Sequence, residues 1–177
     1  MWRLVLSFCI SCSAVVVQGQ SARPNIIYIM ADDMGYADLS GYGRKDYQTP
    51  HLDKLASQGV KFMNAYATAP VCTPTRVAFF TGRYPARLTV GLYEPLAEGR
   101  KDSLVGLSAD NPSIAGLLKK AGYETYLVGK WHLGFKPEFS PIANGFDYFL
   151  GFHAGRQIIF PTKTKEVKLT CMRMTGL

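Results

Sequence analysis

Short apolar runs that end at polar residues or at glycine recur along this chain, and they predict alternating strands and helices. The run at residues 25–30 is almost continuously apolar, which is typical of a strand buried on both faces of a sheet. Further apolar runs predict strands at residues 60–67 and 123–128. Strands of this length separated by helical segments indicate an α/β fold with a largely parallel central sheet.

Three segments carry helix start and stop signals. Residues 49–59 and 111–122 each begin with a capping residue followed by proline, continue with apolar residues at helical spacing, and end at glycine. A third helix is predicted at residues 76–81, because a glycine follows it directly. Cys72 and Pro74 are expected in a turn before this third helix.

Polar side chains follow two of the predicted strands. Asp32 and Asp33 come just after the first apolar run, and Lys130 and His132 come just after the strand at 123–128. In open α/β sheets, ligands bind at the carboxyl ends of the strands. The sequence therefore predicts a functional site built from these four residues and their neighbours.

The first 19 residues have the pattern of a secretory signal peptide. Arg3 is followed by an apolar run at residues 4–17 and by a cleavage zone in which Val17 and Gly19 are the small residues. The run is shorter than the roughly 20 apolar residues that a membrane span needs. We expect cleavage, export along the secretory route and no stable membrane span, with a short anchor or a buried helix as the alternatives.

The composition and the location of charge limit the function classes. With 47% hydrophobic and 19% charged residues, the chain is too apolar for intrinsic disorder. Residues 156–177 carry five basic residues and one acidic residue, a net charge of +4 out of +7 for the chain. The remainder has no basic run and no nucleic-acid-binding motif, so no nucleic acid partner is predicted. Because residues 156–177 lack a helix or strand period, they are expected to lie outside the fold.

Asp32 and Asp33 have two interpretations. Adjacent carboxylates at a buried strand end repel each other and are costly to desolvate unless a cation lies between them. Ca²⁺ and Mg²⁺ prefer such oxygen ligands. The structural alternative is a pair of turn or helix-capping aspartates.

Cys72 opens the sequence CTPTR at residues 72–76. A cysteine at the amino end of a helix lies where the backbone N–H groups favour a thiolate or a bound oxyanion. Arg76, one turn further on, can hold a nucleophile or an anionic substrate. The simpler interpretation is a half-buried cysteine in a proline turn with a solvated arginine, and a disulfide with Cys171 also stays open.

Lys130 and His132 are two residues apart, and in an extended segment such positions point to the same side. Lysine can neutralise an anionic ester, and histidine can protonate a leaving alkoxide near neutral pH. The alternative is that both are ordinary solvated or packed side chains. His51 and His153 are assigned to that ordinary class.

Taken together, these segments resemble the sulfatase family. The sequence CTPTRVAFFTGR at residues 72–83 is similar to the first sulfatase signature, and GYETYLVGK at residues 122–130 is similar to the second, with Trp131 and His132 directly after it. Three more segments are also similar: residues 23–35, 49–53 and 145–147. The resemblance spans residues 23–155, which are expected to form the amino-terminal part of a sulfatase catalytic domain.

The resemblance implies an alkaline-phosphatase-like sandwich and a modified nucleophile. During export, a formylglycine-generating enzyme would oxidise Cys72 to formylglycine, an aldehyde whose hydrate attacks the sulfur of a sulfate ester and expels the alcohol. The second hydrate oxygen then allows sulfate to be eliminated and the aldehyde to reform. Asp32 and Asp33 would ligate Ca²⁺ together with the hydrated Cys72 side chain.

The remaining roles follow from the matched positions. Arg76 would hold the hydrate, Lys130 would bind the sulfate, and His132 would hold the nucleophile or the sulfate oxygens. Fixed cations of this kind stabilise the charge that grows on the sulfate oxygens in the transition state. The compartment implied is the secretory pathway, with a lysosomal, extracellular or periplasmic destination.

Further family ligands, among them a carboxylate, an amide, a second lysine and a second histidine, have no counterpart in this sequence. An ion held by two carboxylates and the hydrate lacks much of the usual Ca²⁺ shell, so the chain by itself is expected to be inactive or unstable. The alternatives are a truncated, non-catalytic chain that binds a partner, and a related phosphoesterase. The phosphoesterase is disfavoured because it would use serine or threonine as its nucleophile.

Overall fold

The structure is a computed structural model that describes residues 23–93, 95–97, 104–154 and 160–163. Its contacts divide the chain into two units, Met1–Gly35 and Tyr36–Leu177. The expected signal peptide, residues 1–19, lies outside the described residues. Among the helices that the structure describes, none is both long and apolar enough to cross a membrane.

The strand predicted at residues 25–30 is wrong. In the first unit these residues belong to no strand, and Ile27 and Ile29 are each 82% exposed. The strand predicted at residues 60–67 is also wrong, since the second unit has no strand there and Tyr66 is 88% exposed. An apolar run favours burial, but a strand exists only where a neighbouring strand completes its backbone hydrogen bonds.

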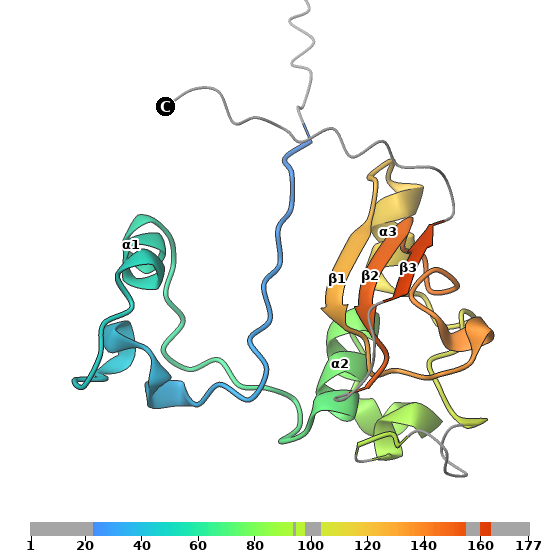
Figure 1. Ribbon diagram of the computed structural model, residues 1–177, viewed down its shortest axis with the longest axis horizontal. Coiled ribbons are helices and arrows are strands. Elements are labelled where there is room, and N and C mark those ends of the chain that lie inside the picture. Colours follow the sequence, from blue (N-terminus) through green and yellow to red (C-terminus); the bar gives the residue numbers. More distant parts are fainter. Residues whose placement is uncertain (1–22, 94, 98–103, 155–159, 164–177) are drawn as a thin grey trace, which may run out of the picture. The chain divides into compact units, whose positions relative to one another are not determined.

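The sheet of the second unit has three strands in the order β1-β2-β3: β1 (Tyr126–Lys130), β2 (Tyr148–Phe152) and β3 (Phe160–Lys163) (Figure 1). The pairing of β1 with β2 is parallel, with Tyr126 opposite Tyr148, and the pairing of β2 with β3 is antiparallel. The described part of the sheet has one parallel and one antiparallel pair and, together with its helices, agrees with the predicted α/β class.

Strand β3 lies beyond the boundary expected at residue 155. Residues 160–163 were placed outside the fold, yet all four of them pair with residues of β2. A short segment without clear alternation still forms an edge strand when a partner offers its backbone groups, and an edge strand tolerates the proline at position 161.

Among the residues that the structure describes, three α-helices accompany the sheet: α1 (Pro50–Gln58), α2 (Cys72–Thr81) and α3 (Ile114–Lys120). Helices α1 and α3 confirm the predicted segments, and α2 ends at Gly82 as predicted, with Gly82 in the left-handed conformation at φ 65°. Helix α2 begins four residues earlier than predicted and includes Cys72 and Pro74. The turn predicted there is wrong, because proline is tolerated in the first helical turn, where its missing N–H has no intrahelical partner to lose.

Short 3-10 helices connect these elements. Their bounds are η1 (Tyr36–Asp38), η2 (Ser40–Tyr42), η3 (Pro85–Arg87), η4 (Thr89–Leu92) and η6 (Pro137–Phe139).

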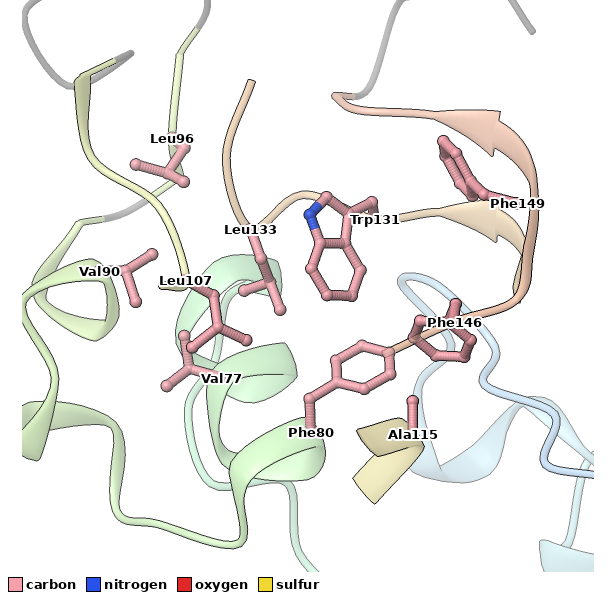
Figure 2. Packing of buried hydrophobic residues seen from close by; sticks show 10 residues of the cluster. All are labelled: Val77, Phe80, Val90, Leu96, Leu107, Ala115, Trp131, Leu133, Phe146 and Phe149. Carbon is pink, nitrogen blue, oxygen red and sulfur yellow. The ribbon is translucent and has the colours of Figure 1, made fainter. Parts of the chain in front are cut away.

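The hydrophobic core joins α2 to the end of β1 and to the start of β2. Figure 2 shows the Phe80 ring of α2 grouped with the rings of Trp131 and Phe146, whose centroids are 5.0 and 5.8 Å away from that of Phe80. Val77, one helical turn before Phe80, is fully buried in the same cluster. Tilted and edge-on aromatic contacts of this kind add about 0.5–1.5 kcal/mol each beyond the burial of area. Packing therefore holds α2 against the segment that follows β1.

A polar contact connects the starts of β1 and β2. The Asp147 carboxylate accepts hydrogen bonds from the backbone N–H and the hydroxyl of Thr125, both at 3.0 Å, and forms an ion pair with Lys119 at 2.7 Å. Burial alone raises the pKa of Asp147, but the bonds from Lys119 and Thr125 outweigh burial and hold the pKa below its ordinary value. The ionised carboxylate thus helps to set the register of the two parallel strands.

Candidate functional site

Cys72 is the first residue of α2, with a free and half-buried thiol. The residue before it, Val71, is extended, so the chain turns into the helix at the cysteine itself. The first N–H groups of a helix lack intrahelical acceptors, and the helix dipole favours negative charge at this end. The thiol therefore lies where an anionic side chain or an anionic ligand is favoured.

The Arg76 side chain points into the protein. It is 7% exposed, and its Nη1 donates a hydrogen bond of 2.5 Å to the backbone carbonyl of Lys130. The solvated arginine that was kept open as an alternative is therefore excluded. Residues four apart lie on the same face of a helix, so Arg76 and Cys72 share one face of α2. The guanidinium is held at the carboxyl end of β1.

Thr73, between Cys72 and Pro74, is fully buried and forms a second link to the segment after β1. Its hydroxyl donates to the backbone carbonyl of His132 at 3.1 Å and accepts from the backbone N–H of Leu96 at 3.3 Å. The first turn of α2 is thus tied both to residue 132 and to the loop around residue 96.

His132 is 4% exposed, and its backbone is left-handed with φ 56°. Its Nε2 donates a 2.9 Å hydrogen bond to the carbonyl of Leu96, and its backbone N–H donates to the carbonyl of His153. The extended segment assumed for Lys130 and His132 is therefore wrong, because β1 ends at Lys130 and the chain bends before His132. The argument from alternating side chains does not apply at this position.

Left-handed backbone marks two of the expected site residues. Among the described residues other than glycine, positive φ occurs at Asp33, with φ 57°, and at His132. Aspartate and histidine tolerate this conformation better than most residues, but it still costs free energy, and such positions are concentrated at functional sites. The roles assigned to Asp33 and His132 stay predictions.

Four of the expected residues belong to one region of the second unit. Helix α2 contributes Cys72 and Arg76, and the end of β1 contributes the half-buried Lys130 together with His132. The bonds from Arg76 to the Lys130 carbonyl and from Thr73 to the His132 carbonyl join the two elements. A thiol, two cations and an imidazole are thus carried by segments that contact each other.

Asp32 and Asp33 belong to the first unit, where both are exposed. In the part of the chain that the structure describes, no three His, Cys, Asp or Glu side chains come together as a group that could hold a metal ion. Ca²⁺ normally takes six to eight oxygen ligands, of which two carboxylates supply a minority. The described residues by themselves do not fit a calcium ion.

The other histidines behave as ordinary side chains. His51 is exposed on α1, and His153 donates from Nδ1 to the carbonyl of Gly134 at 3.1 Å and packs edge-on against Phe149. Sequence reasoning missed Thr73 and Leu96, which hold the region together. A hydroxyl within the CTPTR segment was visible in the sequence, but its partners are 23 and 59 residues away, and no local pattern indicates them.

Comparisons with known proteins identify relatives of this chain. The model of the family named Sulfatase matches residues 24–168. The chain is 41% identical to human N-acetylgalactosamine-6-sulfatase over 138 residues, which cover 75% of this chain and 26% of that protein. It is 48% identical to mouse steryl-sulfatase over 140 residues, which cover 72% of this chain and 22% of that protein.

A solved structure has a fold similar to that of this chain. The PsFucS1 sulfatase from Pseudoalteromonas sp. matches with a TM-score of 0.59 and 36% identity, over 72% of this chain and 25% of that one. The chain thus spans about a quarter of the length of each of these three proteins.

Proposed function

Because this chain belongs to the sulfatase family, with an α/β fold of the alkaline-phosphatase-like class, we propose that it carries the nucleophile-bearing part of a sulfuric ester hydrolase. The observation that supports this most directly is the hydrogen bond from Arg76 to the Lys130 carbonyl, which joins the cysteine helix to the lysine and histidine of the second signature. The substrate class is a sulfate ester, and the route of the protein is the secretory pathway.

The proposed nucleophile derives from Cys72. In the proposed step, the formylglycine-generating enzyme of the export route would oxidise this side chain by two electrons with molecular oxygen as the oxidant. The Cβ–S bond breaks, the sulfur leaves as hydrogen sulfide, and an oxygen atom from the oxidant takes its place as the aldehyde oxygen. The half-buried thiol at the first position of α2 suits this assignment, because the product and a bound oxyanion both lie at the positive end of the helix. When present, the aldehyde hydrate supplies the oxygen that attacks sulfur.

The chain's own residues would then bind and orient the substrate. Arg76 is held in place by the Lys130 carbonyl, so its planar guanidinium is oriented in advance for an anion. Lys130 would contribute a cation to the sulfate oxygens. His132, whose Nε2–H is donated to the Leu96 carbonyl, would hold the nucleophile by accepting its hydroxyl hydrogen at Nδ1, or a sulfate oxygen when Nδ1 is also protonated. Positive groups fixed before the reaction stabilise the growing negative charge without reorganising, which is the largest source of rate enhancement in many enzymes.

For the metal, Ca²⁺, the proposal assigns two carboxylate ligands of this chain. Asp32 and Asp33 would be two carboxylate ligands of Ca²⁺, completed by the Cys72-derived side chain and by further oxygens. The described residues contain no group of three such ligands, so they do not form a calcium site by themselves. The second candidate is the one left open by the sequence, a chain that binds a partner without catalysis.

Mass analysis of the peptide that contains Cys72 tests the proposed nucleophile. The chain would be produced with its leader in a host that has the modifying enzyme, and the aldehyde would be captured with a hydrazide probe. We expect an aldehyde at position 72, and none in Cys72→Ala or in a host without that enzyme. An unmodified thiol throughout would remove the nucleophile and end the proposal.

Hydrolysis of a generic aryl sulfate separates the two candidates. Activity of the purified chain that Cys72→Ala abolishes would exclude the non-catalytic alternative. Aldehyde at position 72 without hydrolysis would mean that the chain needs further residues for catalysis, as the incomplete ligand set predicts. A phosphate ester assayed in parallel tests the phosphoesterase alternative.

A further inference from the structure

Three residues from separate segments form a closed ring of hydrogen bonds beside the candidate site. The backbone N–H of Leu96 donates to the Thr73 hydroxyl at 3.3 Å, and this hydroxyl donates to the His132 carbonyl at 3.1 Å. The His132 imidazole donates to the Leu96 carbonyl at 2.9 Å, which closes the ring. The members belong to α2, to the loop around residue 96 and to the turn after β1.

Chemistry determines the direction of every bond in this ring. A backbone N–H only donates, so the Thr73 oxygen accepts from Leu96 and gives its single hydrogen to the His132 carbonyl. A carbonyl only accepts, so the imidazole must carry its hydrogen on Nε2 to reach Leu96. In the neutral ring, Nδ1 then holds the lone pair.

Burial makes the ring costly to open. Thr73, Leu96 and His132 are 0%, 2% and 4% exposed, so solvent does not readily replace a lost partner. Without the threonine hydroxyl, the Leu96 N–H and the His132 carbonyl would both lose a partner in a buried place. The His132 carbonyl also belongs to a residue with left-handed backbone, which needs outside contacts to persist.

We propose that Thr73 is a positioning residue for His132: its hydroxyl holds the left-handed backbone at His132 and, through Leu96, selects the imidazole tautomer with hydrogen on Nε2. The inference rests on the proposed function only in taking His132 as a site residue. Since Thr73 directly follows Cys72, the same helical turn carries the nucleophile position and orients the histidine.

The test is nitrogen-15 NMR of the three imidazole rings in the full chain with unmodified Cys72, at a pH of about 8, where an unperturbed imidazole is neutral. The His132 signals are assigned by their loss in His132→Gln. We expect His132 to be in the Nε2–H tautomer in the native chain and in Thr73→Ser, which keeps the hydroxyl. In Thr73→Val, we expect its two ring nitrogens to shift toward the average of both tautomers.

A matched control is Thr81→Val, which removes a hydroxyl from the same helix where it donates only locally, to the carbonyl of Val77. This variant should leave the His132 ring signals unchanged. Unchanged signals in folded Thr73→Val would overturn the proposal, as would an Nδ1–H tautomer of His132 in the native chain. The tautomer of His132 in the native chain can be measured even if Thr73→Val does not fold, so the proposal can still be overturned.

The result is independent of catalysis. If Cys72 stays a thiol in the mass analysis but the tautomer responds to Thr73 as expected, the proposed function fails and the positioning role stands. If position 72 carries an aldehyde but the tautomer does not respond to Thr73, the positioning role fails and the proposed nucleophile stands.

Discussion

Helices α1 and α2 have nearly the same length, nine and ten residues, but only α2 contributes to the core. Helix α1 has Leu52 and Leu55 on one face, yet none of its residues is buried, and Leu55 is 64% exposed. Helix α2 buries five residues: Thr73, Pro74, Arg76, Val77 and Phe80. An apolar stripe thus shows that a helix can be buried, and only a tertiary partner decides that it is.

The two helices also differ in how their polar groups are used. At the start of α1, the Asp53 carboxylate accepts hydrogen bonds from Ser40 and Thr49, which are nearby in sequence. At the start of α2, Thr73 and Arg76 donate to carbonyls more than 50 residues away. Local bonds stabilise a helix end, whereas bonds to distant residues place a helix in the fold. The candidate site residues Cys72 and Arg76 lie on α2, the helix that is placed by distant bonds.

The largest effect expected from this difference concerns the modification of Cys72. Thr73, Pro74 and Arg76 are buried, so the proposed modifying enzyme, which would have to reach Cys72 and its neighbours, would have to act before α2 packs. We expect purified modifying enzyme to act on the folded chain about a thousandfold more slowly than on a peptide of residues 68–83, since unfolded fractions are about 10⁻³ or lower. Aldehyde formation measured by mass gives both rates. Equal rates would mean that burial does not protect the motif.

The core contribution of α2 is tested by Phe80→Ala. The ring contacts Trp131 and Phe146, so we expect the free energy of unfolding to fall by about 3–5 kcal/mol. The matched change on α1, Leu55→Ala, removes an exposed side chain and should cost about 0.5 kcal/mol or less. Urea unfolding measures both. Similar losses for the two variants would show that α1 is also packed in solution.

A smaller effect is expected from the link between Arg76 and β1. Arg76→Met removes a buried charged donor from the Lys130 carbonyl and should cost about 1.5–3 kcal/mol. The control is Arg83→Met, because Arg83 donates to Asn111 on the exposed surface and should contribute about 1 kcal/mol at most. Urea unfolding of both variants at one pH compares them. A smaller loss for Arg76→Met than for Arg83→Met would contradict the assigned link.

The smallest effect is pH-dependent and belongs to the start of the two parallel strands. The pKa of Asp147 is lowered in the folded chain, so its contribution to stability is present above its ordinary pKa of 3.8 and is lost as the pH falls through the lower folded value. Because solvent screens the half-buried pair with Lys119, Asp147→Asn should cost about 1 kcal/mol or less at a pH of about 7.

Unfolding free energies of the native chain and of Asp147→Asn, measured between pH values of about 2 and 7, should converge at the acidic end. A difference that persists below the folded pKa would assign the effect to the changed side-chain shape. Lys119→Met, alone and combined with Asp147→Asn, isolates the ion pair, for which a coupling of about 0.2–1 kcal/mol is expected.

Local signals in the sequence were sufficient for α1, for α3 and for the end of α2. Proline near the start and glycine after the end act within one turn, and α1, α3 and the end of α2 agree with them. The start of α2 was missed because a proline suits both a turn and a first helical turn, and only packing separates the two. The start of β1 was also missed, since the strand begins at Tyr126 rather than at residue 123.

For the candidate site, the sequence indicated residue types but not their geometry. Cys72, Arg76, Lys130 and His132 were selected from motifs, and the structure brings the helix and strand that carry them into contact. The left-handed backbone of His132 and its bond to Leu96 were not foreseen, because both depend on partners far along the chain.

By itself, the sequence determined membership of the sulfatase family, the positions of α1 and α3 and the residue types available for chemistry, since these depend on side-chain identity and on spacing within a few residues. Only the tertiary structure decided that Arg76 is buried, that His132 is left-handed and that Thr73 joins α2 to the turn after β1. It also decided that the apolar run at residues 25–30 forms no strand. The reason is physical: burial and strand pairing require a partner surface, and the partner lies elsewhere in the chain.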